Sequence, residues 1–541
     1  MGSLDDALAR FGHRHFRPGQ REALEAVVAG RDVLLVLPTG SGKSLVFQLA
    51  AEVTGGPVIV VSPLLSLMRD QVHALRELGI PAARIDGSGG AVGRRREVER
   101  VTGGDARIAY VTPEQLEHPE LVRALRALGP SLLAVDEAHA LPHWGRSFRP
   151  AFLGLADVAE DLGRPPVAAL TATADPRTRE EIAELLDLRD PVTVLRGIDR
   201  PELHLEVVRV ERPQDELRQM ARLLLPGDGG APPPLDGKGI VYTRTTRAAR
   251  ETARWLAERG VAADHYHGQR AARDRKRVQD GFSSGAIRVV AATNAFGLGI
   301  DEPDVRFVLH RHVPGDLETY WQEAGRAGRD GEPARCTLIY RPAALAKAAF
   351  LEGTGTVARE DLRVVAAALR AGGPGTVAEL AARGDVPAGR VARAVRLLEG
   401  EGALVRRRGR VSAAGDDLDP EAVSLAGEER RAAYDETRQA EMRGYAETDG
   451  CRRAFVLTHF GEPPGDGPCG NCDNDARGVT GSGDDGSVPG LAAGEVVMHR
   501  TFGRGTVTRV EDNVVTVLFE DAGYRTLDGG LAGDVLSADG V

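Results

Sequence analysis

Short apolar runs recur along the first two thirds of the chain, each followed by a loop and an amphipathic stretch. In the first block, residues 20–195, the runs are 33–37, 58–61, 108–111, 132–135 and 167–170. The second block, residues 200–345, repeats the pattern at 239–242, 263–266, 288–291 and 306–310. Uninterrupted apolar runs of this length are typical of parallel strands buried on both faces. The pattern therefore predicts an α/β protein with two tandem parallel-sheet domains.

The last third has a different pattern. Residues 357–414 read as three short helices and two strands around an arginine-rich turn, which resembles a winged helix with 388–398 as its groove-facing helix. A small helical packing module is the alternative. Residues 426–461 are helical in pattern, the composition of 226–239 indicates a surface loop, and that of 475–490 indicates a disordered linker. Alternation at 496–499, 505–510, 514–519 and 524–527 predicts a small all-β unit.

These patterns predict six segments. They are a first sheet domain (1–195), a second sheet domain (196–350), the winged-helix-like domain (357–415), a helical module (425–478), a linker (479–492) and a small SH3/Tudor-like β-barrel (493–541).

The composition is that of an ordinary globular protein, with 42% hydrophobic and 27% charged residues. There is no uncharged apolar run near the roughly 20 residues of a membrane span and no signal-peptide core in residues 1–30, so we expect a cytoplasmic protein without a membrane partner. The net charge of −10 argues against a nucleic-acid partner. However, residues 359–410 hold eleven arginines against six acidic residues, so this stretch either faces phosphate or is a solvated basic face.

Lysine is rare, with 4 lysines against 65 arginines, yet the first lysine falls within the segment LPTGSGKS (37–44). This segment lies between a predicted strand and a predicted helix, where backbone amides cradle phosphates. The loop residues would be Thr39, Gly40, Ser41 and Gly42, with Lys43 reaching the β and γ phosphates and Ser44 binding Mg²⁺. Leu37 stands where the standard pattern has its first glycine.

Two further motifs would complete a hydrolytic site. DEAH (136–139) ends an apolar strand, so Asp136 would hold Mg²⁺ and Glu137 would orient and deprotonate the attacking water. In QEAGRAGRDG (322–331), Arg326 and Arg329 are three residues apart, which would put them on one helical face to stabilise charge on the transferring phosphoryl group. The alternative for DEAH is an acidic start of a helix, and the alternative for the two arginines is that they are unpaired surface residues. A site completed by two domains indicates a motor.

The four cysteines are too few for a disulfide framework. Three of them, Cys451, Cys469 and Cys472, lie within 22 residues, which favours metal binding. Cys336, in a strand-like stretch (335–338), reads as a buried small side chain.

Nine motifs in order resemble the RecQ family of superfamily 2 helicases and cover the first 345 residues: FRPGQ, LPTGSGKS, VSPLLSLMRDQ, VTPEQL, DEAH, TATA, VYTRT, ATNAFGLGID and QEAGRAGRDG. The resemblance implies an ATP- and Mg²⁺-dependent helicase that tracks 3′ to 5′ on single-stranded DNA and unwinds duplexes and junctions in recombination or repair. It implies a location in the bacterial cytosol, associated with the nucleoid.

The resemblance also implies roles for single residues. Arg17 and Gln20 would recognise adenine, and His13 would stack on it. Thr171, Thr173 and residues 294–301 would couple hydrolysis to strand movement. The loop HWGRSFRP (143–150) resembles the family's aromatic-rich loop, where DNA would be contacted by Trp144, Phe148 and Arg149. Core packing is the alternative for the two aromatic residues.

The segments CRRAFVLTHFGE (451–462) and PCGNCDND (468–475) resemble the RecQ zinc module, which has four cysteines. Asp475 stands at the fourth position, so the expected Zn²⁺ ligands are Cys451, Cys469, Cys472 and Asp475. The alternatives are that His459 or Asp473 is the fourth ligand, or that the module holds no metal.

The C-terminal third departs from the family pattern, because the winged-helix-like segment precedes the cysteines instead of following them. The tail (494–507 and the strands after it) resembles the small barrel of UvrD-type helicases, which implies a protein partner, while a passive cap is equally compatible. Two other functions stay open: an RNA or RNA–DNA hybrid helicase, and a nucleotide-gated DNA-binding scaffold that does not unwind.

Overall fold

A computed structural model describes residues 4–38, 40–63, 65–87, 90–103, 106–144, 150–227, 233–296, 302–344, 357–407, 409–415, 418–465, 467–478, 496–500, 502–511, 514–519, 523–528 and 536–538. Two compact units make up the chain. The first is Met1–Tyr340 with Tyr445–Gly486, and the second is Arg341–Gly444 with Ser487–Val541.

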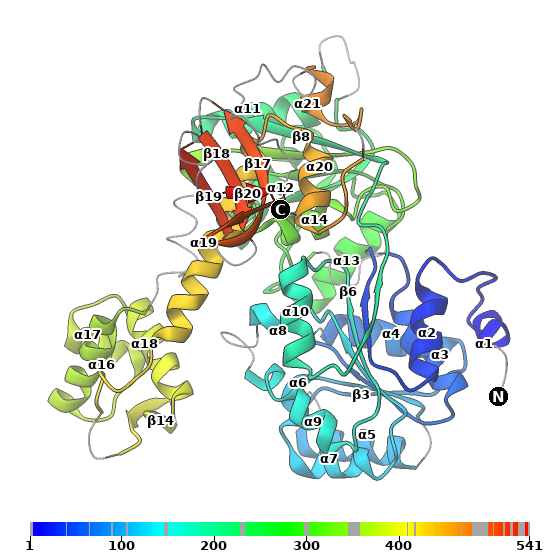
Figure 1. Ribbon diagram of the computed structural model, residues 1–541, viewed down its shortest axis with the longest axis vertical. Helices are drawn as coiled ribbons and strands as arrows, with labels where there is room; N and C mark the ends of the chain where they lie inside the picture. The colour runs from blue at the N-terminus through cyan, green and yellow to red at the C-terminus, as the bar shows by residue number, and fades with distance from the viewer. Residues whose placement is uncertain are drawn as a thin grey trace. The chain divides into compact units, whose positions relative to one another are not determined.

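The first unit begins with a sheet of seven parallel strands in the order β3-β4-β2-β5-β6-β1-β7 (Figure 1). The strands are β1 (Val33–Val36), β2 (Val58–Val61), β3 (Ala82–Ile85), β4 (Ile108–Val111), β5 (Leu132–Asp136), β6 (Val167–Thr171) and β7 (Val192–Leu195). The helices are α1 (Leu4–Arg10), α2 (Gln20–Val28), α3 (Ser44–Val53), α4 (Leu65–Glu77), α5 (Gly90–Thr102), α6 (Pro113–Leu116), α7 (Pro119–Arg126), α8 (Ala140–Trp144), α9 (Leu155–Asp161) and α10 (Pro176–Leu185), with the 3₁₀ turn η1 (Pro150–Phe152).

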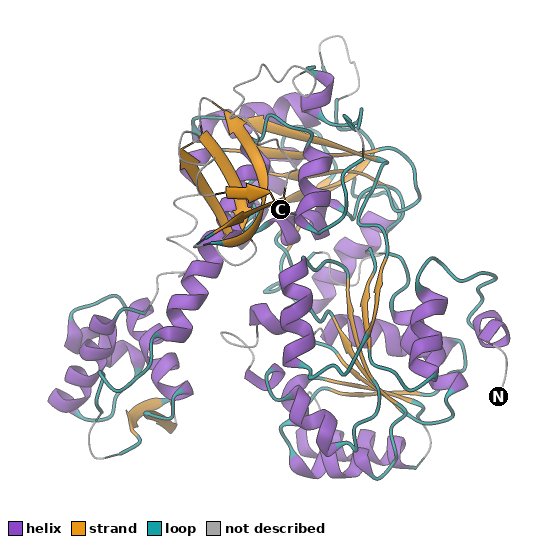
Figure 2. Cartoon of the chain, viewed as in Figure 1, coloured by secondary structure: helices purple, strands orange, loops and turns teal. Residues whose placement is uncertain are grey.

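Alternate residues of these strands feed two separate cores, and helices cover both faces of the sheet (Figure 2). In β1, Val33 and Leu35 pack in a core with helices α1 to α4, while Leu34 and Val36 pack in a core with α5 to α10. Burial on both faces explains why the interior strands are apolar at every position. The five strands predicted for this block are confirmed, and β3 and β7 at the two edges are additional.

The second sheet has six parallel strands in the order β10-β11-β9-β12-β13-β8. They are β8 (Leu203–Arg209), β9 (Lys238–Tyr242), β10 (Ala263–Tyr266), β11 (Val289–Ala292), β12 (Val305–His310) and β13 (Ala334–Tyr340). The helices are α11 (Pro213–Leu224), α12 (Thr246–Ala257), α13 (Ala272–Ser283) and α14 (Leu317–Ala324). All four predicted strands are confirmed, and Cys336 is fully buried in β13.

Residues 445–478, the cysteine module, attach to β8, the edge strand of the second sheet. The module contains α20 (Arg452–His459) and α21 (Asp473–Ala476), and it is entered from α19 (Ala426–Glu447). Leu205 N donates to Asn471 O at 3.3 Å, and Val207 N donates to a carboxylate oxygen of Asp473 at 3.1 Å. The module therefore satisfies backbone groups that an edge strand leaves unpaired. The predicted linker 475–490 is wrong at its start, since Asp475 lies in α21; residues 479–490 fall outside the described part of the chain.

The second unit contains α16 (Arg359–Gly372), α17 (Val377–Gly384) and α18 (Ala388–Gly400), followed by the hairpin β14 (Leu404–Arg407) and β15 (Arg410–Ala413). They share one core, and the three helices and two strands predicted here are confirmed. Several arginines of the stretch 359–410 pair with acidic residues of the same stretch: Arg406 binds Glu399 at 2.9 Å and Arg410 binds Glu379 at 3.2 Å. These arginines are therefore not a uniform basic face.

The C-terminal sheet has five antiparallel strands in the order β19-β18-β17-β16-β20. They are β16 (Val496–His499), β17 (Gly503–Glu511), β18 (Val514–Phe519), β19 (Gly523–Asp528) and β20 (Leu536–Ala538). The four strands predicted here are confirmed. Among the helices that the structure describes, none is both long and apolar enough for a bilayer.

Candidate nucleotide site and cysteine cluster

The predicted phosphate loop connects β1 to the start of α3. Gly40 and Gly42 have φ angles of 81° and 78°, in the left-handed region that favours glycine. A Cβ on Gly42 would lie 2.8 Å from the side-chain nitrogen of Gln20, so a side chain at this position would displace the Gln20 amide from the loop. The loop is thus built from close backbone packing at the N-terminus of a helix, where anions bind. Thr39 lies outside the described residues.

The predicted adenine residues contact this loop. Gln20 is buried, and its side-chain amide donates to the carbonyls of Ser41 and Gly42, each at 2.9 Å. Its side-chain oxygen accepts from the backbone amide of Arg17 at 2.8 Å, and the Arg17 guanidinium donates to Gly40 O. Here Gln20 and Arg17 therefore hold the loop, a role that sequence reasoning missed. His13 is exposed in the segment before α2.

Lys43 is the first residue of the turn into α3, and its ammonium donates to Leu37 O at 3.0 Å and to Pro38 O at 3.4 Å. Burial lowers the pKa of Lys43, and the charges of Glu137 and Asp136 oppose this shift. A phosphate group at the loop would offer this buried cation a better acceptor than two neutral carbonyls.

Ser44 is held by residues that the sequence motifs did not single out. Its hydroxyl accepts from the side-chain amide of Gln71 at 3.0 Å, and Gln71 in turn accepts from the hydroxyl of buried Tyr110 at 2.6 Å. This chain fixes the rotamer of the predicted Mg²⁺ ligand. Gln71 lies in the motif VSPLLSLMRDQ, so the motif contained a signal for it.

The DEAH residues lie at the end of β5, between β2 and β6. Burial, and then the charge of Glu137, raise the pKa of Asp136 to about 7. Glu137 has a φ of 53°, a conformation that costs free energy in a non-glycine residue and is concentrated at functional sites. The buried Asp136 carboxylate therefore lies beside the partly exposed carboxylate of Glu137, an arrangement that favours a nearby cation.

His139 links this motif to TATA. Its Nδ1 lies 3.0 Å from the hydroxyl of Thr171, which donates to Thr173 O at 2.9 Å. Because that hydroxyl has one proton, Nδ1 of His139 must be the donor to it. The same nitrogen lies 3.4 Å from a carboxylate oxygen of Glu137. The predicted coupling residues Thr171 and Thr173 are thus connected through His139 to Glu137, the predicted general base.

The two predicted arginines follow α14, which ends at Ala324. Residues 325–331 form successive turns, with Gly328 at a φ of 63°. The prediction that Arg326 and Arg329 share a helical face is therefore wrong, because glycines end the helix before them.

Arg329 nevertheless approaches the phosphate loop. A Cβ on Gly40 would lie 3.5 Å from Cδ and 3.6 Å from Nε of Arg329. The positive charge of Arg329 also contributes to the lowered pKa of Lys43. Arg326 is buried, and its positive charge opposes the rise that burial causes in the pKa of Tyr242 in β9. The second sheet domain thus supplies one arginine directly to the loop of the first.

The predicted DNA loop falls largely outside the described residues. The backbone of Trp144 ends α8, but its side chain, Phe148 and Arg149 are not described.

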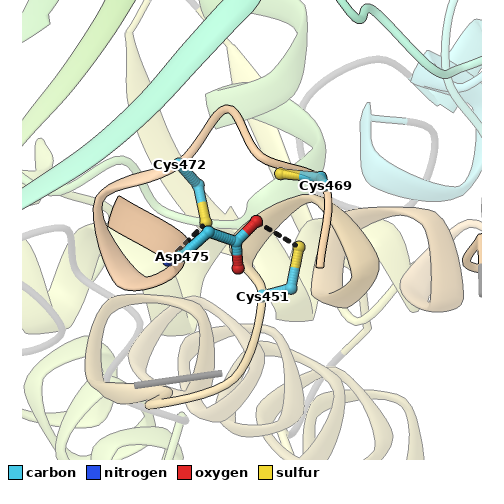
Figure 3. Close-up of side chains that lie close together, drawn as sticks. All are labelled: Cys451, Cys469, Cys472 and Asp475. Atoms are coloured by element: carbon cyan, nitrogen blue, oxygen red, sulfur yellow. Dashed lines mark hydrogen bonds between the residues drawn. The ribbon is translucent and has the colours of Figure 1, made fainter. Parts of the chain in front are cut away.

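The four predicted zinc ligands lie together in the cysteine module (Figure 3). One ligand atom from each of Cys451, Cys469, Cys472 and Asp475 lies within 4.8 Å of all the others. Asp475 accepts from the thiol of Cys451 at 3.7 Å and from Gly470 N at 2.8 Å.

Backbone amides also approach the sulfurs. Asn471 N lies 3.4 Å from the sulfur of Cys469, and Asp475 N lies 3.5 Å from that of Cys472. Amides that donate to sulfur stabilise thiolates. A hydrogen bond with Cys451 and burial raise the pKa of Cys472 well above its usual range, while the same bond lowers the pKa of Cys451. Three sulfurs and a carboxylate at these separations fit a tetrahedral Zn²⁺ site.

The two alternative ligands are placed differently. Asp473 binds the guanidinium of Arg452, with both side chains buried. It also accepts from Val207 N, so its oxygens are occupied by structural contacts. His459 is buried at the end of α20 and is not part of the four-residue group.

The comparisons with known proteins agree with this arrangement of two parallel sheets around one phosphate loop. Residues 17–182 match the DEAD/DEAH box helicases, residues 234–331 match the helicase conserved C-terminal domain, and residues 415–476 match the RecQ zinc-binding family. A crystal structure of the DUF1998 helicase MrfA bound to DNA has a similar fold, with a TM-score of 0.52 and 18% identity over 78% of this chain and 64% of that one.

Two curated relatives align with this chain over most of their own length. An ATP-dependent DNA helicase RecQ from Synechocystis is 41% identical over 348 residues, 63% of this chain and 71% of the relative. A probable ATP-dependent DNA helicase RecS from Bacillus subtilis is 38% identical over 345 residues, 63% of this chain and 68% of the relative. The chain therefore belongs to the RecQ family of helicases.

Proposed function

We propose that this chain is an ATP-dependent DNA helicase that tracks 3′ to 5′ on single-stranded DNA and acts in recombination or repair. The observation that carries the proposal is the side chain of Arg329, which reaches from the second sheet domain to Gly40 of the phosphate loop in the first. A site completed by two domains links each hydrolysis to a change in how those domains meet.

Each residue at the site has a separate task in this proposal. Lys43 and the amides of the loop bind the phosphates, and Ser44 and Asp136 hold Mg²⁺, which neutralises phosphate charge. Glu137 orients and deprotonates the attacking water. Arg326 and Arg329 stabilise charge on the transferring phosphoryl group.

The remaining assignments carry over from the motifs. Arg17, Gln20 and His13 would bind adenine, and Trp144, Phe148 and Arg149 would contact DNA. Cys451, Cys469, Cys472 and Asp475 would hold a structural Zn²⁺ that stabilises the module against β8.

DNA as the substrate is supported by the curated relatives, which are named ATP-dependent DNA helicases. The MrfA structure with a similar fold is bound to DNA. The motifs described above do not distinguish the 2′-hydroxyl of RNA from the deoxyribose of DNA, so the test includes an RNA substrate as one outcome.

The test is an unwinding assay on duplexes that carry a single-stranded tail at either the 3′ or the 5′ end, with and without ATP. We expect ATP-dependent unwinding of the 3′-tailed DNA only, and none with the Lys43→Ala variant. The Glu137→Gln variant should still bind tailed DNA and nucleotide. Unwinding that requires a 5′ tail would refute the polarity, and unwinding that requires an RNA strand would refute the substrate.

The C-terminal sheet is proposed to bind a protein partner. Deletion of residues 492–541 should then remove specific proteins from those that co-purify with the chain. An unchanged set would refute the proposed role.

A further inference from the structure

A column of buried aromatic side chains begins at Arg326 of the proposed ATP site. The hydroxyl of Tyr242, whose pKa is affected by the charge of Arg326, donates to Phe296 O at 2.7 Å. Phe296 belongs to the motif ATNAFGLGID, which the resemblance assigns to coupling. The Tyr242 ring stacks on His310, with centroids 5.4 Å apart and planes 20° apart.

His310 connects this contact to α14. It has no exposed surface, and its Nε2 lies 2.9 Å from a carboxylate oxygen of Glu323, three residues before Arg326. On its other side, His310 packs against Tyr320 with ring centroids 4.9 Å apart. His310 is therefore enclosed between the strand that carries Tyr242 and the helix that leads to the arginines.

Tyr320 in turn reaches the cysteine module. Its hydroxyl and that of Tyr445 are 2.7 Å apart, with ring centroids at 4.8 Å, and both side chains are fully buried. Tyr445 O accepts from the Arg452 guanidinium at 2.8 Å. Arg452 directly follows Cys451 and also binds Asp473, the residue after Cys472, so the column ends at the cysteine cluster.

We propose that Tyr445 and His310 are positioning residues for Arg326, through which the cysteine module sets the geometry of ATP hydrolysis. This inference depends on the proposed function, since it assigns a role to the same arginine. A close-packed column of buried rings has few alternative arrangements. A shift of Tyr445 therefore displaces Tyr320 and His310, and with them Glu323, whose carboxylate contacts His310 and whose backbone carbonyl accepts from Arg326 N at 3.2 Å.

The test is a double-mutant cycle on DNA-stimulated ATP hydrolysis by the full chain. Tyr445→Phe removes one hydroxyl and keeps the ring. We expect kcat to fall roughly 3- to 30-fold with little change in KM for ATP, and His310→Asn to have a similar effect. In the Arg326→Ala background, Tyr445→Phe should change kcat by less than about 2-fold.

Tyr340→Phe is the matched control. Tyr340 is also a buried tyrosine, and its hydroxyl donates to Glu447 of α19 at 2.6 Å. The ring contacts of the column within the described part of the chain do not include Tyr340. The effect of Tyr340→Phe on kcat should be smaller than that of Tyr445→Phe. It should also be the same in the unsubstituted chain and in the Arg326→Ala background. Circular dichroism and thermal unfolding of each variant verify that the fold is retained.

A second measurement does not use turnover. If the cysteine module and the ATP site are coupled, a non-hydrolysable ATP analogue should change the rate at which a chelator extracts zinc from the purified chain. Tyr445→Phe should abolish that change, and Tyr340→Phe should preserve it.

The outcomes separate the inference from the proposed function. An unsubstituted chain that does not hydrolyse ATP would refute the function itself. An active chain in which Tyr445→Phe behaves like Tyr340→Phe, or in which its effect is the same with and without Arg326, would refute the column alone.

Discussion

Asp473 and Asp475 are two residues apart in one short helix, yet we predict opposite consequences when each is replaced. Asp473 forms a buried ion pair with Arg452 and accepts from Val207 N at 3.1 Å. Asp475 points its carboxylate at the cysteines. Asp473→Asn should therefore destabilise the docking of the cysteine module while its zinc remains, whereas Asp475→Ala should lose zinc.

The magnitude for Asp473→Asn follows from burial. The Arg452 and Asp473 side chains are 4% and 5% exposed, so the substitution leaves a buried guanidinium without its counter-charge. Breaking such a pair costs about 3–5 kcal/mol. The contact from Arg477, whose side chain is 57% exposed, adds little. In Asp473→Asn the asparagine oxygen still accepts from Val207 N. Asp473→Ala removes that acceptor, so its cost in unfolding free energy should be larger by about 1 kcal/mol for the unsatisfied Val207 amide.

The assay combines zinc content with the first transition of urea unfolding, since a chain with several domains does not unfold in one step. Glu251→Gln, which alters an exposed ion pair with Arg247 on α12, is the control and should leave both quantities unchanged. If Asp473→Asn lost zinc at a temperature where it stays folded, while Asp475→Ala kept one equivalent, the assigned roles would be reversed.

Three further predictions concern the first sheet domain. Burial alone would raise the pKa of Asp32, but hydrogen bonds from Arg164, Arg189 N and Val167 N hold it below its usual range. A carboxylate with a lowered pKa stabilises the fold above its unfolded pKa, and this contribution is lost as pH falls through the folded pKa. Asp32→Asn should thus destabilise the first sheet domain at neutral pH. Well below about pH 4, its unfolding curve should coincide with that of the unsubstituted chain. An equal difference between the two curves at neutral and at acidic pH would contradict this. Gly42→Ala places a Cβ on a residue with positive φ, 2.8 Å from the Gln20 side chain, so nucleotide affinity measured by titration calorimetry should fall about tenfold. Gly55→Ala is the control, because Gly55 has a φ of 73° but open space around it, and this variant should bind nucleotide normally. Gln71→Leu removes the partner that fixes Ser44, so the Mg²⁺ concentration for half-maximal hydrolysis should rise on the order of tenfold; an unchanged Mg²⁺ dependence would show that this contact has no role.

The apolar pattern predicted the interior strands because a parallel strand buried on both faces must be apolar at every position. The strands absent from the prediction, β3, β7, β8 and β20, are all edge strands. Such strands have one unpaired side and tolerate polar residues, as in β3, where Arg84 pairs with Asp86 at 3.0 Å. The pattern was too weak at these positions to distinguish a strand from a loop.

The site residues were predictable where one local motif determines the geometry, as in the phosphate loop and DEAH. The geometry of Arg326 and Arg329 was not, because a spacing of three residues indicates one face only within a helix, and Gly325 ends α14. The spacing of the cysteines could not distinguish Asp473 from Asp475 either. That distinction depends on Arg452 and Val207, which are distant in sequence and adjacent only after folding.

The central claim is that the second sheet domain completes the ATP site of the first. Single-turnover ATP hydrolysis by Arg329→Ala, measured with saturating tailed DNA, tests this most directly, with exposed Arg247→Ala as the control. We predict a loss on the order of 10³-fold in the hydrolysis rate, with nucleotide affinity changed only a few fold. A rate equal to that of the unsubstituted chain would contradict the claim.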